Sequence, residues 1–168
     1  RRSSDLKKYA GLYSCSNNTN MRKKRIMIIG PSKSGKTTLA NELNGYTGPL
    51  RRTSDIIYGK NTIDVPSAYI ENSWMYKHVI AVSQDASKIL ILVDQSNSVD
   101  VYSPGWAKLF NCPVIGVITK SDMNPENRNI CLHQLKRIGV NEPYFDISFI
   151  KRTGIDVLKK YLFEKCEE

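Results

Sequence analysis

The sequence lacks the features that would place it in a membrane, outside the cell or around a structural metal. Its longest apolar runs, Ile89–Val93 and Val114–Thr119, are far too short to cross a bilayer, and no apolar signal-like segment follows the basic start. The four cysteines are scattered without a C-x-x-C pair, and the two histidines stand alone. We therefore expect a cytoplasmic protein with reduced thiols, no membrane span and no zinc site.

The sequence also lacks an even distribution of positive charge along its length. The formal net charge is +9, but residues 1–25 carry eight basic residues and one acidic residue, so residues 26–168 are almost neutral. A nearly neutral body argues against a dedicated nucleic-acid-binding fold.

Residues 1–20 differ in character from the rest of the chain. Four residues have the spacing of one face of a short amphipathic helix: Leu6, Tyr9, Ala10 and Tyr13. This extension is interpreted either as a disordered basic tail or as a docking helix at residues 5–13 that binds a protein partner. Met21 is a candidate original start, which would make the first twenty residues an added extension. We expect residues 21–168 to form one domain with a sizeable core.

Beyond this extension, apolar strand-like runs alternate with helical patterns, which is typical of an α/β domain. Strands are predicted at 25–30, 55–58, 61–65, 88–94, 113–119 and 143–148, and helices at 36–45, 71–84, 102–110, 126–138 and 154–165. The short link Gly59-Lys60-Asn61 favours a hairpin, so the second and third strands should be antiparallel at one edge. The other strands of this six-stranded sheet should be parallel, with a nucleotide at their carboxyl ends.

The most informative stretch is a phosphate-binding loop. Gly30, four further residues and Gly35-Lys36-Thr37 match G-x-x-x-x-G-K-[ST] between a predicted strand and a predicted helix. Glycines allow the intervening N–H groups to turn inward around an anion, and the helix N-terminus adds partial positive charge. The Lys36 ammonium should bind the β- and γ-phosphates, and Thr37 should bind Mg²⁺. The residues expected to bind the nucleotide here are Gly30, Ser32, Lys33, Ser34, Gly35, Lys36, Thr37 and Thr38.

Two further residues are candidates for the metal and the γ-phosphate. Asp64 ends the run Thr62–Asp64 and should reach Mg²⁺ through water; the alternative is a carboxylate that caps a turn before Pro66. Thr53 is the best candidate for a threonine that senses the γ-phosphate, and otherwise is an ordinary turn residue. The neighbouring Arg51-Arg52 would either stabilise developing charge or remain solvated.

The base is expected to be read by Thr119-Lys120-Ser121-Asp122 after an apolar strand. A carboxylate at Asp122 accepts both donors on the Watson–Crick edge of guanine, and the Lys120 stem would pack on the ring face; the alternative for Asp122 is a helix cap. The motif resembles N-K-x-D of the TRAFAC class of GTPases, which implies a three-layer P-loop fold of the small G-domain type. In the same comparison Ser148 and Phe149 occupy the family's S-A-K-like loop and are expected to contact the base through the backbone. GTP is therefore favoured over ATP.

A closer resemblance is to the EutP/PduV family of ethanolamine- and propanediol-utilisation proteins. It covers the chain from about Met21 and includes the run Asp64 to Asn72, where the family usually has D-T-P-G-E-Y-x-E-N. Ser67 replaces the glycine whose N–H normally bonds the γ-phosphate, and Ala68 stands where many GTPases have a water-orienting glutamine. We therefore expect a weak GTPase with very slow intrinsic hydrolysis.

Lys33 occupies the position where cation-dependent relatives have an asparagine that helps to bind K⁺. A tethered ammonium could replace that ion, in which case activity should be indifferent to K⁺ versus Na⁺, and clear K⁺ stimulation would refute the idea. The alternative is an exposed lysine without this catalytic role.

The resemblance implies a GTP·Mg²⁺-binding protein that acts through a partner and is linked to a bacterial microcompartment shell or enzyme. It also admits a second class, a nucleotide-dependent phosphotransferase such as an acetate kinase. The departures at Ser67 and Ala68 support a third, a nucleotide-binding scaffold without turnover.

Overall fold

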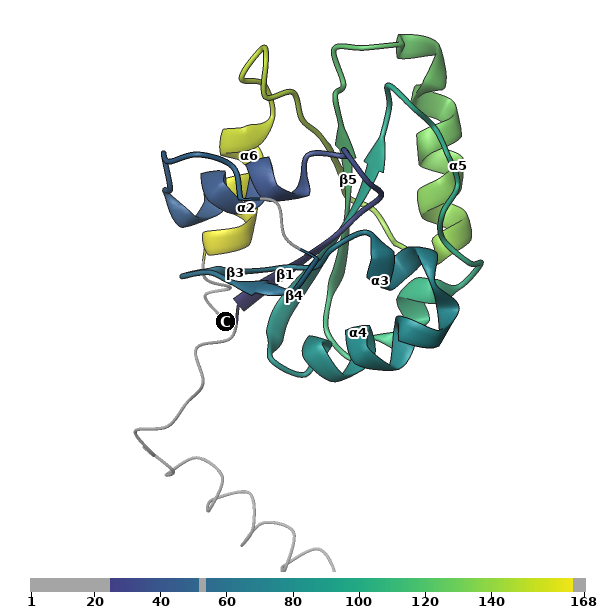
Figure 1. Ribbon diagram of the computed structural model, residues 1–168. Coiled ribbons are helices and arrows are strands. Elements are labelled where there is room, and N and C mark those ends of the chain that lie inside the picture. The colour runs from purple at the N-terminus through teal and green to yellow at the C-terminus, as the bar shows by residue number, and fades with distance from the viewer. Residues whose placement is uncertain (1–24, 52–53, 165–168) are drawn as a thin grey trace, which may run out of the picture.

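The computed structural model describes residues 25–51 and 54–164, which form a sheet with helices on both faces (Figure 1). The sheet has the order β2-β3-β1-β4-β5-β6. Only β2 and β3 are antiparallel, with Ile57 opposite Asp64, and the other neighbours are parallel. The predicted mixed sheet with one antiparallel edge is thus confirmed. The strands are β1 (Arg25–Ile29), β2 (Ile57–Tyr58), β3 (Thr62–Asp64), β4 (Ala86–Asp94), β5 (Val114–Thr119) and β6 (Tyr144–Asp146).

The helices divide between the two faces. Figure 1 shows α2 and α6 on one side of the sheet and α3, α4 and α5 on the other. The α-helices are α2 (Lys36–Asn44), α3 (Ala68–Glu71), α4 (Tyr76–Ser83), α5 (Arg128–Ile138) and α6 (Ile155–Phe163), and three short 3₁₀ helices are η1 (Ser73–Met75), η2 (Trp106–Leu109) and η3 (Pro125–Asn127).

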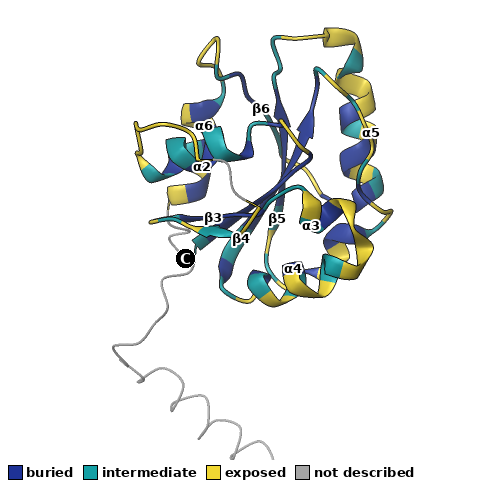
Figure 2. Cartoon of the chain, in the orientation of Figure 1, coloured by how far each residue is buried: buried dark blue, intermediate teal, exposed yellow. Residues whose placement is uncertain are grey.

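This layering follows from the alternation of side chains along the strands. In β1, Ile26 and Ile28 pack into the core beneath α2 and α6, whereas Met27 and Ile29 pack into the core beneath α3, α4 and α5. Figure 2 shows the central strands buried on both faces. Each fully buried side chain of this size contributes about 1.5–3 kcal/mol to stability, which explains why the middle strands are almost wholly apolar.

Two of the helix predictions were wrong in their extent. The helix expected at 71–84 is interrupted at Asn72, whose backbone is extended and whose side chain donates to the Ala68 carbonyl oxygen (2.8 Å). This local bond gives the backbone an alternative to continuing the helix. The helix expected at 102–110 is reduced to η2, because Pro104 disfavours helical geometry before it and Gly105 has a φ of 71°.

No helix in residues 25–51 and 54–164 is long and apolar enough to span a membrane. The proposed docking helix at 5–13 and the candidates Arg52 and Thr53 lie outside the described residues. The carboxyl ends of the parallel strands lie at the same edge of the sheet, and the residues of the sequence motifs follow there. These strands are β1, β3, β4 and β5.

Candidate functional site

The phosphate loop joins β1 to α2 and has a backbone that requires glycine at two positions. A Cβ at Gly30 would lie 2.6 Å from Ser34 Oγ and 2.9 Å from Leu92 Cβ, so no side chain fits there. Gly35, directly before α2, has a φ of 91°, a conformation that residues with a Cβ rarely adopt. The result is an open cradle of backbone at a helix N-terminus, which is a suitable site for phosphate groups.

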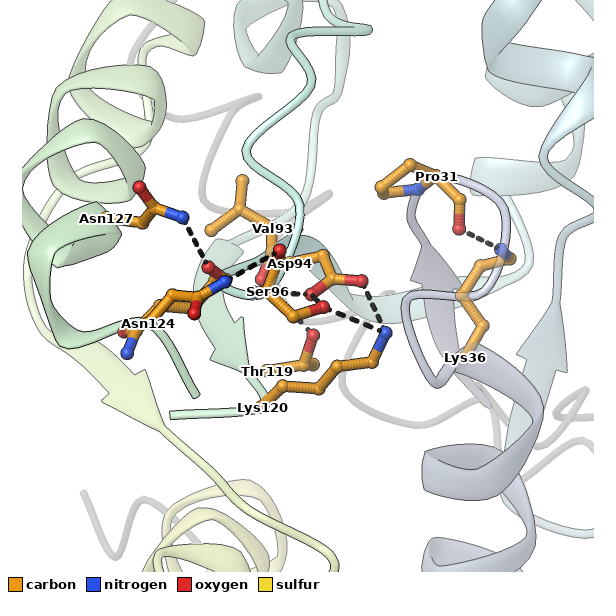
Figure 3. A network of polar contacts seen from close by, with 10 residues as sticks. Pro31, Lys36, Val93, Asp94, Ser96, Thr119, Lys120, Asn124 and Asn127 are labelled. Atoms are coloured by element: carbon orange, nitrogen blue, oxygen red, sulfur yellow. Dashed lines mark hydrogen bonds and ion pairs between the residues drawn. The ribbon is translucent and has the colours of Figure 1, made fainter. Parts of the chain in front are cut away.

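Lys36 places a buried cation beside this cradle. Its side chain is only 9% exposed, and its Nζ donates to the Pro31 carbonyl oxygen at 2.7 Å (Figure 3). Burial lowers the pKa of Lys36, and the nearby Asp64 and Glu71 carboxylates oppose that shift. An ammonium has three donors, so two remain for the oxygens of an anion.

Thr37 and Asp64 form a pair of hard oxygen ligands next to Lys36. Thr37 Oγ1 donates to Asp64 Oδ2 at 2.9 Å, and Asp64 ends β3 next to β1. Burial raises the pKa of Asp64, while the Thr37 hydrogen bond and the Lys36 charge lower it. Mg²⁺ prefers one or two protein oxygens together with phosphate oxygens and water, and this donor set fits it.

Most of the predicted phosphate-binding residues line one cavity of about 480 Å³, together with Asp64 and Ser67. They are Ser32, Lys33, Gly35, Lys36, Thr37 and Thr38. Lys33 is exposed and has a φ of 61°. Ser34, in contrast, is fully buried, and its Oγ has no hydrogen-bond partner among the described residues.

Ser67 and Ala68, the two departures from the family pattern, lie at the start of α3. Ser67 has helical angles (φ −58°, ψ −29°), which any residue adopts, so the serine introduces no backbone strain in this conformation. Ala68 is exposed and begins α3. Its methyl group can neither donate nor accept a hydrogen bond.

The residues predicted to read the base follow β5 and β6. Ser148 Oγ donates to Asp122 Oδ1 at 2.7 Å, and this bond lowers the pKa of Asp122. The bond joins the two predicted base loops and leaves the carboxylate ionised. Thr119 is buried and donates to the Val93 carbonyl oxygen at 3.3 Å. The Phe149 ring lies against Gly35 of the phosphate loop.

Lys120 is held by the last residue of β4 and by a residue that follows this strand. Its Nζ donates to Asp94 Oδ2 at 2.6 Å and to Ser96 Oγ at 3.3 Å, and Figure 3 shows all three side chains together. The Lys120 stem was predicted to pack on a base, and the ion pair with Asp94 holds the end of this side chain.

Sequence reasoning did not identify Gln95 as part of this support. Gln95 is 1% exposed, and its Nε2 donates to the carbonyl oxygens of Ser121 (3.2 Å) and Met123 (2.8 Å). Asn124 and Asn127 in turn donate to the backbone of Ser96 and Gln95. The sequence signal was a polar run directly after a buried strand, which is common in loops and carries little information by itself.

A second cavity of about 350 Å³ adjoins the cavity of about 480 Å³ beside the phosphate loop. It lies against α2 and the β2–β3 hairpin, and the two cavities share Thr37, Arg51, Ile57 and Asp64. Its other lining residues include Ala40, Tyr46, Tyr58 and Lys60, so it combines an apolar lining with cations.

Comparison with known proteins gives relatives along most of the chain. The family model described as "Ethanolamine utilisation - propanediol utilisation" matches residues 23–164. The chain is 33% identical over 143 residues to the propanediol utilization protein PduV of Citrobacter freundii, covering 84% of this chain and 95% of that protein. It is 31% identical over 144 residues to the "Probable acetate kinase EutP" of Escherichia coli K12, covering 83% and 89%.

Among solved structures, translation elongation factor SelB of Methanococcus maripaludis in complex with the GTP analogue GPPNHP has a TM-score of 0.60 at 24% identity. The match covers 83% of this chain and only 33% of the elongation factor. A protein described as "a probable GTP-binding protein engB" also has a TM-score of 0.60, at 19% identity, covering 83% of this chain and 97% of that one. At these identities the structures establish a shared fold.

Proposed function

The chain belongs to the ethanolamine utilisation–propanediol utilisation family, and on that premise we propose that it binds GTP with Mg²⁺ in the cavity above the phosphate loop. One observation carries the proposal. The buried Lys36 ammonium faces the same cavity as the Thr37–Asp64 pair, at the mouth of a glycine cradle. A buried cation with unused donors beside two oxygen ligands is complementary to a metal-bound polyphosphate.

Each residue of this site has a distinct task. The cradle N–H groups and Lys36 would bind the phosphates, while Thr37 and Asp64 would hold the metal. Mg²⁺, when bound, neutralises charge on the β- and γ-phosphates. Asp122, whose pKa is lowered by the hydrogen bond from Ser148, would accept the N1–H and N2–H donors of guanine. Adenine lacks that pair of donors, so GTP and GDP should bind in preference to ATP.

Calorimetry with GTP, GDP, ATP and a non-hydrolysable GTP analogue, each with Mg²⁺, tests this proposal. GTP and GDP should bind tightly and ATP weakly. If ATP and GTP bound with equal affinity, Asp122 would not be the residue that selects the base. If no nucleotide bound, the proposal as a whole would be overturned.

Intrinsic hydrolysis should be very slow, because Ala68 cannot orient a water molecule. We expect a single-turnover rate constant on the order of 10⁻³ s⁻¹ or lower, the range of unstimulated GTPases. The measurement uses an excess of protein over radiolabelled GTP, with GTP alone as the control. Hydrolysis at about 1 s⁻¹ or faster without a partner would contradict this expectation.

We place the protein in the cytoplasm with a partner from a bacterial microcompartment, bound through residues 5–13. The family description supports a connection to ethanolamine or propanediol utilisation. Deleting residues 1–20 should abolish co-purification with that partner and leave GTP affinity unchanged, and unchanged association would remove the docking segment.

A nucleotide-dependent phosphotransferase is the second candidate, and the adjoining cavity favours it. An acceptor bound there would lie next to Thr37 and Asp64, with the exposed Arg51 available for its carboxylate. Relatives carry the name "Probable acetate kinase EutP". Production of acetyl phosphate from acetate and nucleotide would make this the primary function, and its absence under conditions of tight GTP binding would eliminate it.

A further inference from the structure

The Phe149 ring makes a direct contact between the base-reading side of the site and the phosphate loop. A Cβ built on Gly35 would lie 3.2 Å from Phe149 Cε2 and 3.8 Å from Cδ2. The ring therefore covers the glycine that precedes α2. It also packs against the core beneath α2 and α6.

The loop that carries Phe149 is itself firmly joined to Asp122. Ser148 Oγ donates to the Asp122 carboxylate, and the Ile147 carbonyl oxygen accepts the Ser121 N–H at 3.1 Å. Ser148 and Thr153 exchange backbone hydrogen bonds of 3.0 and 3.1 Å across the loop. The backbone that carries Phe149 is therefore connected to the Asp122 loop by the Ser148–Asp122 and Ser121–Ile147 hydrogen bonds.

Other connections between these two regions are sparse. Within the described chain, we find no hydrogen bond between residues 30–38 and either residues 119–122 or residues 146–153. Glu42 of α2 pairs with Arg152 (2.8 Å), which is 62% exposed, and with Lys159 of α6 (3.0 Å), which is 33% exposed; both ion pairs end at Glu42, outside residues 30–38. Solvent-exposed ion pairs of this kind contribute little. The parallel strands fix the positions at which the phosphate loop and the base-reading loops begin. The Phe149–Gly35 contact joins these loops beyond the ends of the strands.

We propose that Phe149 is a positioning residue that sets the distance between the base-reading carboxylate of Asp122 and the phosphate cradle. This inference rests on the proposed function, since it concerns the same nucleotide. A nucleotide joins a base and a polyphosphate covalently, so its affinity depends on how well two subsites are placed relative to each other. The ring keeps them placed before the ligand arrives.

The proposal distinguishes ligands that use one subsite from those that use both. Pyrophosphate occupies the phosphate cradle alone, whereas GDP spans the cradle and the base loop. Phe149→Ala should weaken GDP binding about tenfold or more through lost preorganisation. Its affinity for pyrophosphate should change by less than about twofold, because the cradle itself retains its glycines and Lys36.

The controls are a conservative variant at Phe149 and a truncation of the neighbouring residue Ile150. Phe149→Leu keeps an apolar side chain against Gly35 and should restore GDP affinity to within about threefold of the wild type. Ile150→Ala truncates a side chain that is 82% exposed in the same loop and should leave GDP affinity unchanged. Equal affinity for GDP in Phe149→Ala and wild type, or tighter binding, would overturn the proposal, as would an equal loss for pyrophosphate.

Hydrogen exchange in the nucleotide-free protein separates this proposal from the proposed function. Phe149→Ala should speed amide exchange in residues 33–38 and at Asp122, whereas Ile150→Ala should not. Unchanged exchange in both regions would overturn the contact's role even if GTP binds. Conversely, a wild-type protein that binds neither GDP nor pyrophosphate would refute the nucleotide site. In that case, faster amide exchange in Phe149→Ala than in the wild type would still demonstrate the link between the two loops.

Discussion

Replacing Lys36 with methionine is expected to lower GTP affinity by about 100-fold or more, because the variant loses a charge-assisted contact made by a buried ammonium. The ammonium is almost fully buried, and its one acceptor among the described residues is the Pro31 carbonyl oxygen. Burial lowers the pKa of Lys36, yet the carboxylates of Asp64 and Glu71 act in the opposite direction. The phosphates would add a stronger partner, so the charged form should dominate in the complex.

The measurement is calorimetric titration of GTP with Mg²⁺, paired with thermal denaturation of the free protein. Methionine keeps an unbranched apolar stem, so the melting temperature should stay within about 2–4 °C of the wild type, the shift produced by roughly 1 kcal/mol in a domain of this size. Lys77→Met, which removes an exposed charge from α4, is the matched control and should bind GTP normally. GTP affinity within about threefold of the wild type in Lys36→Met would refute the phosphate site.

Replacing Asp122 with asparagine is expected to change which base is bound. The amide keeps one acceptor and gains a donor, so it meets the N2–H group of guanine with the wrong partner. GTP affinity should fall about 100-fold or more, since buried donors left unpaired are costly. Xanthosine triphosphate has a carbonyl oxygen in place of that amino group and should bind the variant better than GTP.

Competition titrations of GTP and xanthosine triphosphate against both proteins provide the measurement. Asp156→Asn removes a carboxylate from the exposed start of α6 and is the matched control; it should retain the preference for GTP. An Asp122→Asn protein that still prefers GTP would eliminate this carboxylate as the base reader.

The Ser148–Asp122 bond adds a pH dependence to the same experiment. Because the bond lowers the pKa of Asp122, the carboxylate remains ionised as the pH falls through the ordinary range of aspartate. The binding of guanine nucleotide should therefore persist there and decline only at more acidic pH. In Ser148→Ala the decline should begin at a higher pH.

The phosphate loop shows how much a local pattern can determine. Its strand, glycines and helix are adjacent in the chain, and Gly30 and Gly35 have the steric environment and the backbone angle that the spacing indicated. The alternation of apolar strand-like runs with helical patterns likewise predicted the sheet, because parallel strands need a helix to connect one to the next. The errors at 71–84 and 102–110 arose where a local hydrogen bond at Asn72 and the Pro104-Gly105 pair outweighed apolar periodicity.

The sequence by itself therefore determined the α/β class and the mixed sheet, and it predicted the residues of the candidate site, because each of these depends on neighbours in the chain. Only the tertiary structure decided which distant residues meet. The pairing of Lys120 with Asp94, the support from Gln95 and the contact of Phe149 with Gly35 all join segments that follow different strands. The physical reason is that strand order in the sheet brings these loops to one edge, and strand order depends on the packing of the whole domain rather than on any local pattern.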